Sequence, residues 1–269
     1  MEGKNKASDK TSSRVLFSIL LAMFALLSLV AATVAWFSIA DFTKVYSMSM
    51  DITSGTNLRF DLDPHDSFEE YVKTLSFGQI AARIRQEKKT DIATTPLEPV
   101  TTRDYSVFFY EDGSVVPTDS GAYIEFTLHF MATESMLIHL TSAGTEDGAG
   151  TAVMSSNAAL PNAMRISFTA DGKTYVYDPG MGDDAKVKGN NKTMGLPAAE
   201  KMIPNENNQM FWLEKDQDKT VVVRIWLEGT DEACTDALRK ANYAISLRFV
   251  GTDENQHILD GTRQKQYDN

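Results

Sequence analysis

Apolar and polar residues alternate with a period of two along most of the chain after residue 40. The clearest case is YIEFTLHF (123–130), in which every second residue is apolar. Such alternation over four to eight residues is typical of a β-strand with one face in a core. The pattern recurs in KVYSMSMDI (44–52), NLRFDL (57–62), SMLIHL (135–140), TVVVRIWLEG (220–229) and NYAISLRF (242–249). Many short strands separated by turn signals predict an all-β fold, a jelly-roll-like antiparallel β-sandwich.

Two Asp-Gly pairs predict where strands reverse. Asp112-Gly113 lies within RDYSVFFYEDGSVVP (103–117), and Asp171-Gly172 lies within MRISFTADGKTYVY (164–177). Because glycine adopts the positive φ that tight turns need, each pair predicts a β-hairpin.

Helical patterns are limited to two segments, so we expect short helical insertions in the sandwich. Residues 67–89 place apolar side chains at helical spacing, which predicts one or two amphipathic helices with Ser67 as a cap. Residues 230–240 predict a second, short helix. The stretches 141–161 and 179–208 are rich in Gly, Ala, Ser and Asn, and we interpret them as long surface loops.

A long run without charge, residues 15–40, follows four basic residues. About 20 apolar residues in a helix cross a hydrocarbon core of roughly 30 Å. The basic flank predicts that residues 1–14 stay in the cytoplasm and that the domain 41–269 is exported. A cleaved signal peptide and a retained transmembrane anchor both fit, since cleavage-site patterns end near residues 35 and 40.

Composition narrows the function classes. The chain of 269 residues carries a formal net charge of −11, and its first forty residues are net positive. Because so acidic a body repels phosphates, we expect no nucleic-acid partner. Cys234 is the single cysteine, which excludes an intrachain disulfide and a zinc site built on paired cysteines.

Few residues suggest chemistry. No His-Glu-x-x-His, catalytic triad, phosphate-binding glycine loop or dinucleotide motif is present, so we predict a protein that is not an enzyme and holds no cofactor or metal. Three alternatives deserve a structural check. A hairpin centred on Glu134 would bring His129 and His139 face to face, where the two imidazoles could share a metal ion. Two groups of carboxylates could bind calcium through their oxygen atoms, but each group could equally lie in a solvated turn. The first group is Asp61, Asp63 and Asp66, and the second is Glu228, Asp231, Glu232 and Asp236.

The two tryptophans of the exported part, Trp212 and Trp226, suggest a further alternative. Both suit core or rim positions, and an exposed indole would also suit a platform for a sugar ring. We therefore keep a surface module that binds a glycan or a host protein as the alternative function, and a secreted hydrolase ranks last.

Two segments near the start resemble the TasA/camelysin family of secreted Gram-positive surface and biofilm-matrix proteins. They are ATVAWFS (32–38) and SGTNLRFDLDP (54–64). The matching export-signal positions are Thr33, Ala35, Trp36, Phe37 and Ser38, and the later ones are Gly55, Thr56, Leu58, Phe60, Leu62, Asp63 and Pro64. Residues 221–238 resemble a segment of clostridial surface proteins. The resemblance implies a jelly-roll sandwich and assembly at the cell surface, and no motif here carries the protease activity described for some members.

These observations combine into one hypothesis. We expect a non-catalytic structural protein of the cell surface or extracellular matrix, held to the membrane or secreted, that associates with itself or with other surface proteins. The segment 41–52 would add as a strand to an open sheet edge of a neighbour. The residues that would set its register are Tyr46, Met48, Met50 and Ile52.

Overall fold

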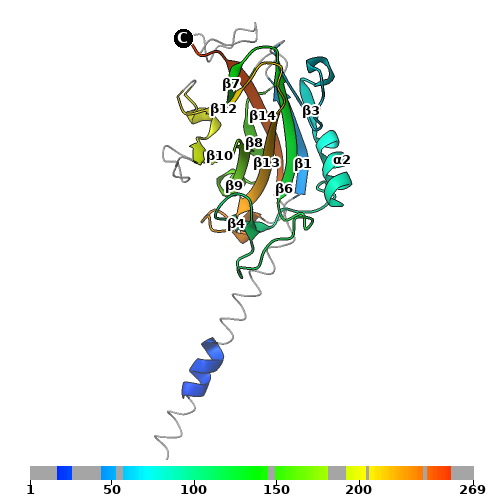
Figure 1. Ribbon diagram of the computed structural model, residues 1–269. Coiled ribbons are helices and arrows are strands. Elements are labelled where there is room, and N and C mark those ends of the chain that lie inside the picture. The colour runs from blue at the N-terminus through cyan, green and yellow to red at the C-terminus, as the bar shows by residue number, and fades with distance from the viewer. Residues whose placement is uncertain are drawn as a thin grey trace, which may run out of the picture. The chain divides into compact units, whose positions relative to one another are not determined.

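The computed structural model describes residues 17–25, 44–52, 57–144, 149–180, 192–203, 206–238 and 241–255. The chain divides into two compact units, Met1–Ala40 and Asp41–Asn269. In the first unit, residues 17–25 are helical with exposed apolar side chains. The second unit is an all-β sandwich with short helical insertions, as the alternation predicts (Figure 1).

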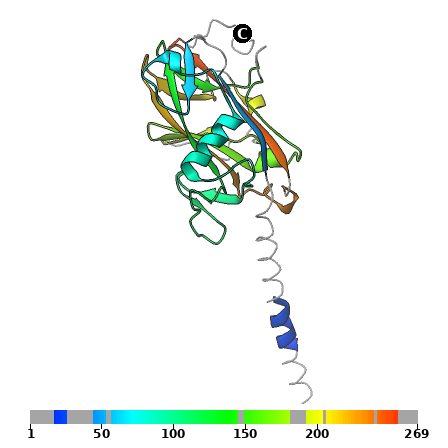
Figure 2. The same ribbon diagram turned by 90° about the vertical axis from the view of Figure 1, so that its right-hand side faces the viewer.

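One sheet has the strand order β12-β7-β14-β1-β3, and β8 also pairs with β14. Its strands are β1 (Lys44–Ile52), β3 (Thr74–Ser76), β7 (Met136–Leu140), β8 (Ala152–Ser155), β12 (Gln209–Leu213) and β14 (Asn242–Thr252). β7 and β8 pair antiparallel with successive halves of β14. β1 pairs parallel with β14 and antiparallel with β3. Figure 2 shows β1, in blue, running beside β14, in orange-red.

The other sheet is centred on β13 (Lys219–Glu228), which pairs antiparallel with β9 and β6 and parallel with β4. β10 and β11 continue it beyond β9, and β2 continues it beyond β6. The remaining strands are β2 (Leu58–Asp61), β4 (Pro99–Thr102), β5 (Phe108–Phe109), β6 (Ile124–Ala132), β9 (Met164–Ala170), β10 (Lys173–Tyr177) and β11 (Thr193–Leu196).

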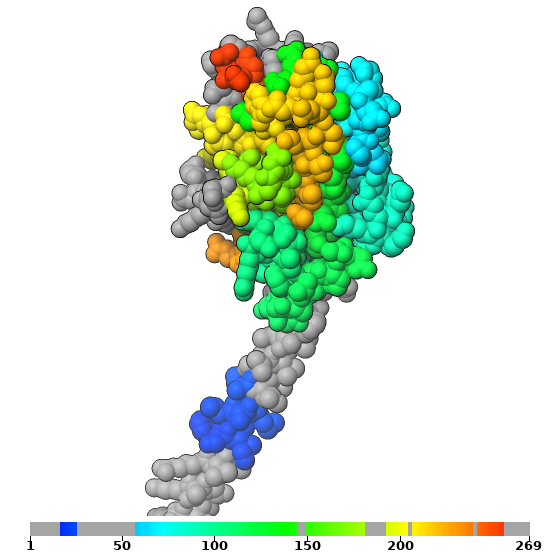
Figure 3. Space-filling model, viewed as in Figure 1, coloured from blue at the N-terminus to red at the C-terminus, as the bar shows by residue number. Residues whose placement is uncertain are grey.

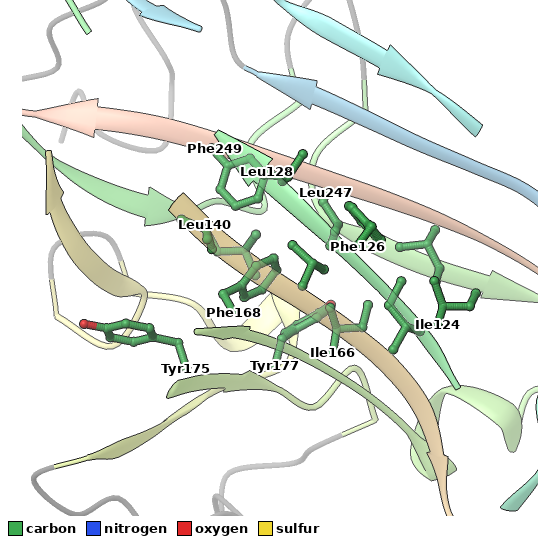
Figure 4. Close-up of a cluster of buried hydrophobic side chains, with 14 of the residues drawn as sticks. Ile124, Phe126, Leu128, Leu140, Ile166, Phe168, Tyr175, Tyr177, Leu247 and Phe249 are labelled. Atoms are coloured by element: carbon green, nitrogen blue, oxygen red, sulfur yellow. The ribbon is translucent and has the colours of Figure 1, made fainter. Parts of the chain in front are cut away.

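The core lies between the two sheets and is built from the inward set of each alternating strand. On β6, the inward residues Ile124, Phe126 and Leu128 are at most 1% exposed. Phe168 and Phe249 meet across the sandwich with ring centroids 5.6 Å apart (Figure 4). Burying each such side chain contributes roughly 1.5–3 kcal/mol, so the period-two pattern is also the main source of stability.

Both Asp-Gly turns form as predicted. Asp171 (φ 50°) and Gly172 (φ 72°) join β9 to β10 with both residues in the left-handed region. Gly113 (φ 80°) closes the other hairpin, in which Phe109 pairs with Val115.

The predicted helical segment 67–89 is divided in two. Ser67 and Glu70 form a capping box at η2 (Phe68–Glu70), and Ser76 caps α2 (Phe77–Lys88). Between them the chain is extended, because Val72 exchanges two backbone hydrogen bonds with Phe60 on β2. Tertiary pairing therefore overrides the helical spacing there.

The segments interpreted as loops also contain regular structure. Residues 141–161 include β8, and residues 179–208 include β11 and η3 (Ala199–Lys201). α3 (Leu160–Ala163) begins within the first of them. The helix expected over 230–240 contracts to turns and η4 (Asp236–Leu238). β8 and β11 are four residues long and each pairs with one strand. Strands this short leave little periodicity in the sequence to detect.

Candidate functional site

A cleft of about 750 Å³ lies between β12, at one margin of its sheet, and the β9–β10 hairpin of the other sheet. Figure 3 views the molecule from a side where residues of both elements, coloured yellow-green to yellow, reach the surface. The cleft is lined by Leu137, Ala170, Asp171, Gly172, Lys173, Tyr175, Lys192, Met210, Phe211 and Trp212. The cleft thus joins an aromatic and aliphatic wall to two lysines.

Trp212 is half-buried and held in place by its indole nitrogen. Nε1–H donates to Oε1 of Glu214 at 2.9 Å, and the other oxygen of this carboxylate accepts from Ser135 Oγ at 3.1 Å. Trp212 also lies opposite Leu137 in the β12–β7 register. The hydrogen bond therefore holds the indole in a fixed orientation.

The charged side chains that line the cleft differ in their interaction partners. Asp171 on the hairpin turn accepts from Lys219 Nζ at 2.7 Å. Lys173 Nζ instead lies 5.3 Å from the centroid of the Tyr175 ring, a cation–π contact. In Figure 4 the hydroxyl of Tyr175 points away from the other labelled core side chains. Among the described residues, no carboxylate lies within ion-pair distance of Lys173, which lines the cleft.

A second polar cluster connects β6, β13 and the η2 segment. His129 Nδ1 lies 2.9 Å from Oδ2 of Asp218, and the Tyr71 hydroxyl donates to Oδ1 of Asp218 at 2.7 Å. Burial, with help from the Asp218 carboxylate, raises the pKa of Tyr71 to about 12. Among the described residues, no hydroxyl or thiol hydrogen-bonds to Nε2 of His129.

The proposed pairing of His129 with His139 is wrong. β6 and β7 do not form a hairpin, because they belong to different sheets. His139 is fully buried, with Nε2 2.8 Å from Thr252 Oγ1 and Nδ1 3.3 Å from Asn208 Oδ1. Burial lowers the pKa of His139 to about 4, which keeps the ring neutral. The two imidazoles therefore share no ligand.

Members of both acidic groups raised as calcium alternatives are engaged in structural contacts. Asp63 pairs with Arg83, whose hydrogen bond lowers the pKa of that carboxyl, and Asp61 accepts from the backbone N–H of Leu62. Asp231 pairs with the buried Arg165 at 2.6 Å. Within the described part of the chain, no three His, Cys, Asp or Glu residues are grouped so as to hold a metal ion.

Trp226 is excluded as a surface platform. Its ring is 1% exposed and packs against Phe108 at 5.3 Å and Tyr105 at 6.1 Å. Trp226 thus belongs to a small buried cluster that is separate from the main core. Cys234 is partly buried and packs against the main core, and burial together with the nearby carboxylates of Glu228 and Asp231 raises the pKa of its thiol to about 11.

The predicted assembly residues lie on a strand that is already paired within the chain. Tyr46 falls at a register shift of β1. Met48, Met50 and Ile52 are the register partners of Ile245, Leu247 and Phe249 on β14. Those three β14 residues are core residues, at most 1% exposed.

The export-signal positions Thr33, Ala35, Trp36, Phe37 and Ser38 lie outside the described residues. Over the described ranges, no helix has the length and apolar character needed to span a membrane.

Comparisons with known proteins add no relative. No family model matches the chain, and neither the curated proteins nor the solved structures contain a significant match.

Sequence reasoning identified one part of the cleft and missed the rest. It singled out Trp212 as a core or rim aromatic that could form a platform, and Asp171-Gly172 as a turn. Lys173, Tyr175 and Lys192 carried no motif, and only the packing of β12 against the hairpin brings them to Trp212.

Proposed function

We propose that the protein is a non-catalytic structural component of the cell surface or extracellular matrix, of the kind that the TasA/camelysin family represents. It would be exported on the apolar segment 15–40, with or without cleavage, and would associate with copies of itself or with other surface proteins. The association would use β1, exchanged between neighbouring molecules.

The pairing of β1 is the observation that carries this proposal. β1 is the first strand of the sandwich and lies between β14 and β3. It follows β14 in parallel from Lys44 beside Asn242 to Ile52 beside Phe249. If β1 left this position, β14 would expose a long edge of unpaired backbone groups next to the core.

An identical strand from a second copy satisfies that edge with the same hydrogen bonds. Exchange of an element between identical chains costs little, because the strand makes the same interactions in a neighbouring molecule as in its own. β1 suits this exchange because only its C-terminal end leads into the rest of the sandwich. Successive exchanges would join molecules into a chain, as the strand-addition hypothesis requires.

A cysteine-trapping experiment tests the exchange. Ser49 and Ser246 are register partners on β1 and β14. Neighbouring strands lie about 4.8 Å apart, which suits a disulfide. In a Cys234→Ala background, chains carrying Ser49→Cys are co-refolded with chains carrying Ser246→Cys and mildly oxidised. We expect a covalent heterodimer on a non-reducing gel.

The matched control pairs Ser49→Cys with Ser114→Cys, which lies on an exposed turn of the other hairpin. That mixture is expected to stay uncrosslinked. The exchange is refuted if the Ser49–Ser246 mixture crosslinks no more than this control while a single chain bearing both cysteines closes its own disulfide.

Export is tested separately by fractionating cells that express the full chain and sequencing the N-terminus of the mature protein. A new terminus between Trp36 and Asp41 indicates a released subunit, and an intact N-terminus in the membrane fraction indicates a tethered one. Full-length chain in the cytosol contradicts the surface role.

The alternative, a ligand-binding surface module, is favoured by one specific observation. Trp212 lines an open cleft, whereas Trp226 is buried. Binding in the cleft and assembly through β1 are compatible, because no residue of β1 lines the cleft.

A further inference from the structure

The cleft between β12 and the β9–β10 hairpin has the size and the lining of a small-ligand site. This inference gives a ligand class to the surface-module alternative, on which it rests, and does not depend on the assembly role. Small-molecule sites are concave, largely apolar and roughly 300–1,000 Å³ in volume, with a few polar groups that fix the ligand. At about 750 Å³, the cleft falls within that range.

The bottom of the cleft is closed by aromatic side chains from both sheets. Tyr175 on β10 and Phe211 on β12 are each 4% exposed, and their ring centroids lie 6.5 Å apart. Phe211 also packs edge-on against Phe130 of the core, with ring centroids 5.5 Å apart. The bottom of the cleft is therefore continuous with the core of the sandwich, which holds the shape of the cleft without a ligand.

One side of the cleft carries the indole of Trp212. The residue is half-buried, and the bond from its Nε1–H to Glu214 at 2.9 Å holds the orientation of the ring. A ring ordered in this way offers an apolar surface to a ligand at little cost in side-chain entropy. A flat apolar surface of this kind suits the C–H face of a pyranose ring.

The other side of the cleft, the β9–β10 turn, offers hydrogen-bonding groups. Asp171 accepts from Lys219 through Oδ2 at 2.7 Å, and among the described residues no group donates to its Oδ1. Lys173 Nζ lies 5.3 Å from the centroid of the Tyr175 ring and, within the described ranges, donates no hydrogen bond. The turn therefore presents an acceptor and a donor, which neighbouring hydroxyl groups of a ligand can use together.

The charges of this turn favour a neutral ligand. Asp171 and Lys173 are opposite in sign, so an anion or a cation at the turn would be repelled by one of them. Lys192 also lines the cleft, but it already interacts with another group of the protein. A purely apolar ligand would remove the carboxylate and the ammonium from water without replacing their hydrogen bonds, whereas a neutral polyol replaces them.

The edge of β12 is poorly suited to accept a peptide strand. Its pairing with β7 shifts register between Gln209 and Trp212, and the regular part of the strand is short. Because such a shift disturbs the regular spacing of edge N–H and C=O groups, strand addition is disfavoured there. Recognition at this cleft is therefore expected to come from side chains.

We propose that this cleft binds a neutral saccharide, with one pyranose ring against Trp212 and neighbouring hydroxyl groups at Asp171 and Lys173. The C–H face of the ring covers the indole. The hydroxyl groups at the edge of the ring donate to the carboxylate and accept from the ammonium. The apolar surface and the hydrogen-bonding pair thus act on different parts of the same ring.

The experiment titrates the full chain with defined probes. The protein is kept in a detergent without a sugar headgroup, and binding is followed by calorimetry and by tryptophan fluorescence. The probes are cellotriose, maltotriose and triacetylchitotriose, with trigalacturonate as the anionic comparison. We expect saturable binding of at least one neutral probe, at least tenfold tighter than that of trigalacturonate. Its affinity should change less than twofold between about 50 and about 500 mM NaCl, because salt does not screen a neutral ligand.

Variants assign the binding to the cleft. Trp212→Ala and Asp171→Gly are each expected to weaken binding at least tenfold, whereas Trp212→Phe retains most of it. Because glycine tolerates the positive φ of Asp171 (50°), Asp171→Gly removes the carboxylate and keeps the turn. The matched control is Asp216→Gly, since Asp216 also has a positive φ (53°) but does not line the cleft. It should bind like the parent, and circular dichroism checks that each variant is folded.

Three results would overturn the proposal. The first is the absence of saturable binding of every neutral probe, and the second is unchanged binding by either folded variant, Trp212→Ala or Asp171→Gly. The third is tighter binding of trigalacturonate than of any neutral probe, which would show that charge selects the ligand. A negative outcome leaves the strand-exchange test unaffected, because that test measures disulfide formation between β1 and β14.

Discussion

Thr151 donates its backbone N–H to the backbone oxygen of Thr141 at 2.9 Å, which joins the end of β7 to the start of β8. Both threonines bond to the backbone of Arg248 on β14. β7 and β8 therefore lie along β14 like one interrupted strand. The hydrogen bond between Thr151 and Thr141 joins the two parts at the interruption. The closure depends on a close backbone approach at Gly150.

Gly150→Ala should be strongly destabilising, because a Cβ atom there would lie 1.9 Å from the backbone oxygen of Ser142. We expect a loss of about 2 kcal/mol or more in the free energy of unfolding, measured by urea denaturation. The matched control is Gly78→Ala in α2, where the nearest atom is 3.9 Å away. That change should stabilise by about 0.5–1 kcal/mol, and equal effects of the two would refute the close approach.

Glu125→Gln tests a charge cluster on β6. Glu125 pairs with Lys88 Nζ and Arg224 Nε, each at 2.5 Å. Burial opposes the charged carboxylate, but the hydrogen bond from Lys88 and the charge of Arg224 outweigh it and lower the pKa of Glu125. Neutralising it should cost about 1–3 kcal/mol in denaturant titrations. Glu87→Gln, whose exposed carboxylate pairs with Arg83, should cost less than about 0.5 kcal/mol.

His139 makes stability depend on pH. Its pKa is about 4 in the folded protein, and that of an unfolded histidine is about 6.5. The unfolded chain therefore binds the extra proton between these values, so stability is complete above pH 6.5 and is lost as pH falls toward 4. The loss approaches about 3 kcal/mol.

The measurement is a set of urea titrations between pH 7.5 and 4.5 for the parent and for His139→Gln. The variant should be less stable at neutral pH, yet its stability should fall less between pH 7 and pH 5. Parallel curves for the two proteins would show that His139 does not titrate as its burial requires.

Cys234 should react slowly with iodoacetamide at pH 7.5. Its thiol pKa of about 11 leaves little thiolate, the reactive form. We expect the alkylation rate, followed by mass spectrometry, to rise at least tenfold in denaturant. Equal rates in the folded and unfolded protein would contradict the buried environment.

The elements of the fold were largely predictable from local patterns. The alternation in IEFTLHFMA matches β6, and Asp171-Gly172 forms the turn that its residue types favour. Ser67 caps η2 through a capping box with Glu70. Each of these features depends on residues close in sequence, which is why one sequence suffices to find them.

Strand partners were not predictable in the same way. Alternation shows which face of a strand is buried, but β6 and β7 have similar patterns and still enter different sheets. His129 and His139 were therefore placed together wrongly. The cleft escaped prediction for the same reason, since Lys173 and Trp212 line one cleft only because the two sheets pack together.

The parallel contact between β1 and β14 also fixes the order of events during synthesis. The earliest strand to leave the ribosome has its partner at the far end of the domain, so the last contact cannot close until nearly all of the chain has emerged. Such high contact order slows folding. During that delay β1 has no partner in its own chain, and the β14 edge of a neighbouring molecule could pair with it through the same backbone hydrogen bonds.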